Sequence, residues 1–152
     1  MMIWTEMLPL TDLVQGGPKV QAQMACRGVY VIFDKSKIVY IGSARKEVFG
    51  GRLIKHCVKL LGWPVAGISF GKSRWPAYLK KRKHDLKDMS VSLLCIDDYG
   101  LAAAIEAELI RRFKARSGER PELNSNSPRV QLPAGATVTE PPNMPPLRAT
   151  GS

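Results

Sequence analysis

Two tyrosines, an arginine and a histidine follow one another in the first half of this chain at spacings that suit phosphate chemistry. Tyr30 and Tyr40 lie in the strings Gly28-Val29-Tyr30 and Tyr40-Ile41-Gly42, which are separated by nine residues. Arg52 and His56 follow, and on a helix their spacing would put both side chains on one face. A guanidinium can clamp a phosphate with two parallel hydrogen bonds, and a phenol or an imidazole can position a water molecule. Each residue taken alone has an ordinary structural interpretation, such as a half-buried aromatic or a structural histidine.

One carboxylate stands out in the second half of the chain. When residues 101–115 are projected at about 100° per residue, the large apolar side chains form one arc, and Glu106 falls inside it. A carboxylate in an apolar setting must be paired, protonated or bound to a cation. The sequence leaves two alternatives open, a buried salt bridge with Arg52 or another base and ligation of a metal ion.

Local patterns predict the elements that position these residues. The stretch 28–42 is rich in β-branched and aromatic residues on both sides of a polar break at 34–37, which predicts a β-hairpin with the two tyrosines on neighbouring strands. Residues 89–96 predict a third strand, and residues 65–72 could hold another short one. Helices are predicted over about 52–61, from an N-cap at Ser73 to about residue 85, and over about 101–115. We therefore expect an α+β fold with a small, mostly antiparallel three-stranded sheet flanked by helices.

The 152 residues are enough for one ordinary domain. Residues 1–25 predict an N-terminal arm or short amphipathic helix that ends at Gly16-Gly17-Pro18, and residues 26–126 predict the folded domain. Residues 127–152 are rich in proline and carry no aromatic residue, which predicts a disordered tail. The three cysteines are widely spaced and predict reduced, mostly buried thiols. No stretch resembles a membrane span or a signal peptide, so we expect a cytoplasmic protein.

The net charge of +10 is concentrated in one segment. Residues 45–87 hold twelve Lys or Arg residues and two acidic ones, whereas the rest of the chain is close to neutral. Such segregation favours a nucleic acid backbone as partner over a merely solvated surface. His84 lies in this run and is expected to attract phosphate, whereas Trp75 is expected to be buried. The predicted DNA contacts are Arg45, Lys46, Lys55, Lys59, Lys72, Arg74, Lys80, Lys81, Arg82 and Lys83.

The two tyrosine strings, together with three later segments, resemble the GIY-YIG endonuclease family. Arg52-Leu53-Ile54-Lys55-His56 is similar to the arginine and histidine block of that family, and Glu106-Ala107-Glu108-Leu109-Ile110 is similar to the block with its metal-binding glutamate. Pro121-Glu122-Leu123-Asn124 resembles the segment that ends in the family's asparagine. The blocks occur in the family's order over roughly residues 26–124, which is more specific than any one of them.

This resemblance implies a role for each matching residue. Tyr30 would activate or position the attacking water, Tyr40 would lie beside it, and Arg52 would clamp the scissile phosphate. Glu106 would hold Mg²⁺ or Mn²⁺, which needs only one or two protein carboxylates because it keeps most of its waters. His56 is a further catalytic candidate, and the Asn124 amide would hold either the active site or phosphate. Gly28 and Gly42 would have a structural role, Gly42 also allowing close approach of DNA.

The expected activity is therefore metal-dependent hydrolysis of DNA by a compact endonuclease. Two alternatives stay open. One is a catalytically inactive DNA-binding or adaptor domain on the same scaffold, and the other is an RNA-directed nuclease, since backbone contacts do not distinguish the sugar.

Overall fold

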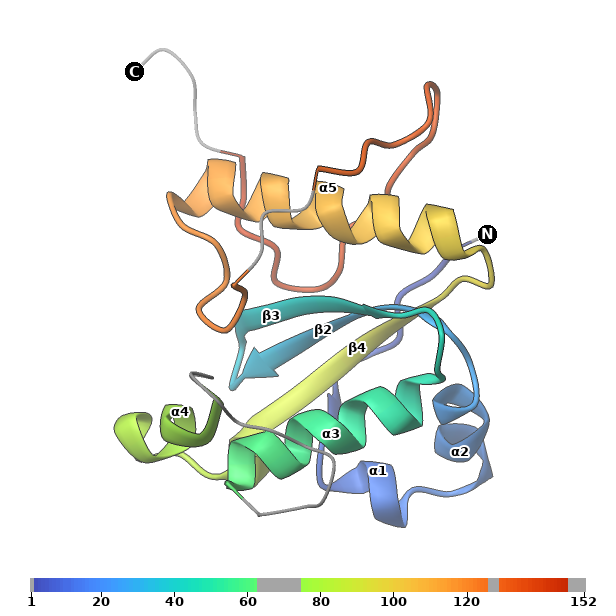
Figure 1. Ribbon diagram of the computed structural model, residues 1–152. Helices are drawn as coiled ribbons and strands as arrows, with labels where there is room; N and C mark the ends of the chain where they lie inside the picture. The colour runs from blue at the N-terminus through green and yellow to red at the C-terminus, as the bar shows by residue number, and fades with distance from the viewer. Residues whose placement is uncertain (1, 63–74, 126–128, 148–152) are drawn as a thin grey trace.

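The computed structural model describes residues 2–62, 75–125 and 129–147, which form an antiparallel sheet between two layers of helices (Figure 1). The sheet has four strands in the order β1-β4-β2-β3. Their bounds are β1 (Leu8–Pro9), β2 (Gly28–Asp34), β3 (Lys37–Ala44) and β4 (Met89–Cys95). The α+β class is as predicted, but the prediction of three strands was wrong. Leu8 pairs with Val91 and Pro9 with Ser90, and a strand of two residues is too short to leave an alternating pattern in the sequence.

Helices cover both faces of the sheet. In Figure 1, α1 (Asp12–Gln15), α2 (Pro18–Met24), α3 (Phe49–Leu61) and α4 (Trp75–Arg82) lie on one side, and the long α5 (Tyr99–Ser117) lies on the other. Gly62 ends α3 with φ 68°, a left-handed conformation that glycine adopts easily. Helix α4 ends before the predicted residue 85 because Lys83 takes φ 57°. Its predicted N-cap, Ser73, and the possible strand at 65–72 lie outside the described residues.

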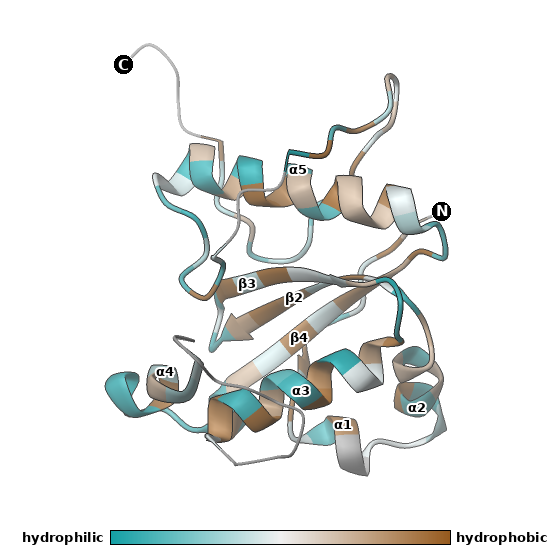
Figure 2. Cartoon of the chain, in the orientation of Figure 1, coloured by the Kyte–Doolittle hydropathy of each residue, from teal (hydrophilic) through white to brown (hydrophobic). Residues whose placement is uncertain are grey.

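Strand β2 is buried on both faces, and its side chains alternate between two cores. Tyr30 and Ile32 belong to the core beneath α3, whereas Val29, Val31 and Phe33 belong to the core beneath α5. Figure 2 shows the corresponding run of hydrophobic residues along the central strands. Burial on both faces explains why β2 is apolar throughout instead of alternating with polar residues.

A β-bulge in β3 sets the direction of Tyr40. Ile32 pairs with Tyr40 and Phe33 pairs with Ile38, so Val39 is an extra residue on β3. Val39 and Tyr40 therefore both contact the core beneath α3, although neighbours in a regular strand point to opposite faces. The bulge brings the Tyr40 ring to the same side of the sheet as Tyr30.

Both chain termini pack on the domain. The N-terminal segment forms β1 and α1, and Pro18 begins α2 instead of ending the arm. The C-terminal residues 129–147 are not a free tail, because they pack beside α5. Glu140 pairs with Arg112 and Arg116, and Trp4 Nε1 donates a hydrogen bond to the Thr139 carbonyl over 2.7 Å. These partners are far apart in sequence, so composition alone did not reveal them.

Two further findings concern the exposure of the cysteines and the length of the apolar helices. The three cysteines are free thiols, but Cys26 and Cys57 are only half-buried and Cys95 is exposed, which corrects the prediction of mostly buried thiols. In residues 2–62, 75–125 and 129–147, no helix has the length and apolar character needed to cross a membrane.

Candidate active site

Four of the six predicted catalytic residues meet at the free edge of the sheet. Because β3 is an edge strand, side chains from both helical layers can reach each other beyond it. A cavity of about 150 Å³ lies there, with Tyr40 from β3, Arg52 from α3 and Glu106 from α5 in its wall. The other lining residues are Ser43, Arg45, Ile110, Asn124 and Ser125. A larger depression of about 630 Å³ lies elsewhere, and of the predicted site residues only Arg82 and Asn124 line it.

The two tyrosines are neighbours, but only Tyr40 lines the cavity. Their ring centroids are 6.0 Å apart, as expected for diagonal neighbours on one sheet face. Tyr30 is completely buried, whereas Tyr40 is half-buried. Burial raises the pKa of both phenols, and the nearby Arg52 guanidinium only partly offsets this effect. Both phenols therefore keep their protons at neutral pH. The predicted role of Tyr30, to activate or position the attacking water, stays a prediction.

Gly42 makes the close approach of the tyrosines possible. It is paired with Tyr30 across the hairpin. A Cβ at this position would lie 2.6 Å from Tyr40 Cε1 and 2.7 Å from Tyr30 Cζ and Oη. Gly28 is required for a different reason, because its φ is 147° and a Cβ there would lie 2.0 Å from the Leu94 carbonyl oxygen. Both predicted structural glycines thus have a steric cause.

His56 lies behind Tyr30, away from the cavity wall. Its Nε2 is 2.5 Å from Tyr30 Oη, and its ring stacks on Trp75 at a centroid distance of 4.4 Å. Burial, with the positive charges of Arg52, Lys59 and Lys55, lowers the pKa of His56 to about 3. The imidazole is therefore neutral and forms a hydrogen bond with the protonated phenol of Tyr30. We interpret His56 as a residue that positions Tyr30. Trp75 is buried, as predicted.

Arg52 remains a cation with an unused donor. Its buried Nε has no hydrogen-bond partner among the described residues. Its closest ionic partner is Glu47, with Nη1 and Oε1 3.7 Å apart, and Glu47 also accepts from Lys55 Nζ at 3.1 Å. Arg52 thus forms no salt bridge with Glu106 in the described structure, so that alternative for Glu106 is not supported. The Arg52 side chain lies in the cavity wall, and a guanidinium can donate to phosphate oxygens.

Glu106 is the only carboxylate among the residues that line this cavity. Burial raises the pKa of Glu106, and the charges of Arg45 and Arg52 act in the opposite direction. The Ser43 hydroxyl lies close enough to lower this pKa as well, although Ser43 Oγ is buried without a hydrogen-bond partner of good geometry. The cavity therefore contains a carboxylate and a hydroxyl side by side.

These oxygen groups fit a Mg²⁺ ion that keeps most of its waters. The described residues contain no group of three or more His, Cys, Asp or Glu side chains suited to a metal ion. Mg²⁺ does not require one, because it is commonly held by one or two carboxylates plus substrate phosphates. Glu106 would supply the carboxylate, and the Ser43 hydroxyl lies beside it.

Asn124 holds the edge strand through both the oxygen and the nitrogen of its amide. Its Oδ1 accepts from the Ile41 N–H and its Nδ2 donates to the Ile41 carbonyl, both over 2.9 Å. The neighbouring Leu123 N–H donates to the carbonyl oxygen of Val39, the extra residue of the bulge, over 2.9 Å. The side chain thus pairs with β3 as an additional strand would. Of the two predicted roles, the structure supports holding the active site.

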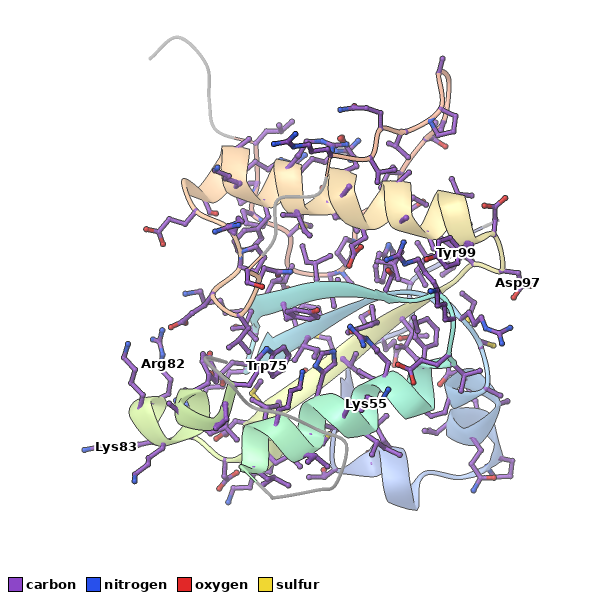
Figure 3. The ribbon with its side chains drawn as sticks, viewed as in Figure 1. Lys55, Trp75, Arg82, Lys83, Asp97 and Tyr99 are labelled. Carbon is purple, nitrogen blue, oxygen red and sulfur yellow. The ribbon has the colours of Figure 1, made fainter. Side chains whose placement is uncertain are left out.

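The predicted DNA-binding residues do not form one uniform surface. Lys80, Lys81 and Lys83 are exposed, and Figure 3 shows Arg82 and Lys83 projecting from the end of α4, far from Tyr99. Arg82 forms an ion pair with Glu122, and Lys55 with Glu47. Arg45 and Lys46 line a second cavity beside the active site. Lys59 lies on α3, whereas Lys72 and Arg74 lie outside the described residues.

His84 has a structural partner. Its Nδ1 lies 2.8 Å from Oδ2 of the buried Asp34, which also accepts from Tyr78 Oη over 2.7 Å. This cluster joins α4 to the hairpin. The buried Asp34 carboxylate thus takes up Nδ1 of His84, one of its two ring nitrogens. The attraction of phosphate by His84 stays a prediction.

Sequence reasoning did not single out two residues of this region. Ser43 directly follows Tyr40-Ile41-Gly42, so its place beside a predicted site glycine was a usable signal. Tyr99 begins α5 and lies beside Arg45, with the guanidinium carbon 4.7 Å from the ring centroid. That contact joins residues 54 positions apart and left no local pattern.

Comparisons with family models, curated proteins and solved structures found no match to this chain.

Proposed function

We propose that this protein is a metal-dependent DNA endonuclease that hydrolyses phosphodiester bonds at the edge of β3, with a site of the GIY-YIG type. The observation that carries the proposal is the convergence of Tyr40, Arg52 and Glu106 from three different elements on one cavity of about 150 Å³. The motif order in the sequence and the steric need for Gly28 and Gly42 add support. The concentration of positive charge in residues 45–87 favours a polyanionic substrate.

Arg52 would bind the scissile phosphate. Its side chain lies in the cavity wall, and a guanidinium stays charged throughout the neutral pH range. Stabilising the extra negative charge that develops on phosphorus in the transition state is the main task of such a site. The ion pair with Glu47 holds the guanidinium in place from the side of α3.

Tyr40 would donate a hydrogen bond to an oxygen of the reacting phosphate. Because burial raises its pKa, the phenol is a donor at neutral pH and is a poor base. Tyr30 and His56 would support it from behind, through the bond of 2.5 Å between them and the packing of the rings. Asn124 and Gly42 would keep β3 and its tyrosine in register.

Glu106 would hold the metal ion. A Mg²⁺ ion held there would polarise a phosphate oxygen and a coordinated water. The Glu106 carboxylate must be ionised to act as a metal ligand. Because its pKa is raised, we expect metal binding to be lost on acidification at a higher pH than for an exposed glutamate.

A plasmid assay tests the proposal. Wild type and Glu106→Gln are incubated with supercoiled plasmid and with a matched RNA, in Mg²⁺ and in chelator, and nicked and linear products are followed. We expect cleavage of DNA by wild type in Mg²⁺ alone. If neither protein cuts but both bind DNA with equal affinity, the inactive binding domain replaces the proposal. Preferential cutting of the RNA would replace DNA as the substrate class.

A further inference from the structure

Tyr99 is an exposed aromatic ring held in a fixed place. It is the first residue of α5, and 48% of its surface is exposed. Asp98 caps this helix by accepting from the Leu101 N–H over 2.8 Å, which fixes the backbone next to Tyr99. The Arg45 guanidinium lies over the ring, with its central carbon 4.7 Å from the ring centroid. A guanidinium over one face of the ring leaves the remaining exposed surface of Tyr99 and the outer side of the guanidinium open to stack on a planar group.

This surface borders the candidate active site. Tyr99 and Arg45 line a cavity of about 310 Å³ together with Ser43, Lys46, Glu47 and Arg52. Ser43, Arg45 and Arg52 also line the smaller cavity that contains Glu106. Cavities that hold small organic ligands begin at about 300 Å³. A phosphate bound at Arg52 would therefore have its neighbouring nucleotide in a cavity of suitable size.

We propose that Tyr99 and Arg45 form a stacking platform for an unpaired nucleobase next to the phosphate bound at Arg52. The base must be unpaired because both faces of a base inside a duplex are covered by its neighbours, whereas a flap, a bulge or a single strand exposes them. Lys46, in the same cavity, provides a charge for the backbone of that nucleotide. The proposal rests on the proposed nuclease function and names its substrate class, which is DNA with an unpaired nucleotide at the cleavage site.

Binding in chelator tests this without any cleavage. Two DNA molecules of equal length are used, a continuous duplex and a duplex with a single-nucleotide bulge that carries 2-aminopurine. Affinities are measured by anisotropy for wild type, Tyr99→Phe and Tyr99→Ala. Stacking on an aromatic side chain is worth about 5- to 100-fold in affinity per base. We expect Tyr99→Ala to lose about this factor for the bulged DNA alone, and Tyr99→Phe to bind like wild type.

The fluorescence of 2-aminopurine gives an independent measurement, because stacking quenches it. Wild type and Tyr99→Phe should quench the signal on binding, and Tyr99→Ala should not. Equal losses of affinity for both DNA molecules, or quenching that survives in Tyr99→Ala, would overturn the stacking platform and leave the nuclease proposal intact. If wild type binds neither DNA, both proposals fail.

Discussion

Replacing Asn124 by alanine tests whether this side chain holds the edge strand or contacts the substrate. In the structure the amide makes two hydrogen bonds of 2.9 Å to Ile41, and Asn124 is only 6% exposed. Asn124→Ala leaves the N–H and the carbonyl of Ile41 without these partners. Each unpaired buried group costs about 1–3 kcal/mol, and entry of water reduces this, so we expect a loss of about 2–4 kcal/mol in the free energy of unfolding.

Thermal and urea unfolding measure this loss directly. For a domain of 152 residues, each kcal/mol lowers Tm by about 2–4 °C, so the expected decrease is on the order of 10 °C. Asn124→Asp is the matched control. It keeps an acceptor for the Ile41 N–H but sets an oxygen against the Ile41 carbonyl, so it should not restore full stability. An unchanged Tm combined with abolished DNA cleavage would refute the reasoning, because the amide would then act on the substrate.

Three further predictions concern charge and packing. Because burial raises the Glu106 pKa, folding favours its protonated form. Metal-free Glu106→Gln should therefore melt above wild type at pH 8, and the difference should vanish below about pH 4, the range in which an unfolded glutamate titrates, as thermal scans across pH would check. Gly42→Ala should lose about 1–3 kcal/mol of stability and most activity, because its Cβ would meet both tyrosines, whereas Gly17→Ala meets no atom within 4 Å and should match wild type in both assays. Lys80 and Lys81 are exposed, and we replace both by glutamine. The slope of log affinity against log salt concentration should then decrease by about one unit for each DNA phosphate that the protein no longer neutralises. An unchanged slope would mean that these α4 lysines do not contact DNA.

Local sequence patterns predicted the parts of the site that depend on neighbouring residues. The hairpin with Tyr30 and Tyr40, the helix with Arg52 and His56, and the place of Glu106 in an apolar arc all follow from spacing and residue type within one or two elements. The structural need for Gly42 was also visible, since it stands two residues after a strand tyrosine.

Contacts between distant segments could not be predicted in this way. Tyr40 lines the cavity and Tyr30 does not, because β3 is the edge strand and β2 lies inside the sheet, and local patterns do not show which strand lies at the edge. The pairing of His84 with Asp34 joins residues 50 positions apart, and the packing of the C-terminal segment depends on Glu140 meeting two arginines of α5. These contacts are fixed by packing of the whole chain.

The rate of cleavage of one DNA substrate under single-turnover conditions tests the central claim most directly. Wild type is compared with Tyr40→Phe, Arg52→Lys and Glu106→Gln in Mg²⁺, with DNA binding measured in chelator for each. Removing one group that stabilises the transition state costs on the order of a hundredfold in rate, so we expect losses of about this size for Arg52→Lys and Glu106→Gln with DNA binding retained. Cleavage by Glu106→Gln at the wild-type rate, or cleavage that persists in chelator, would contradict the account.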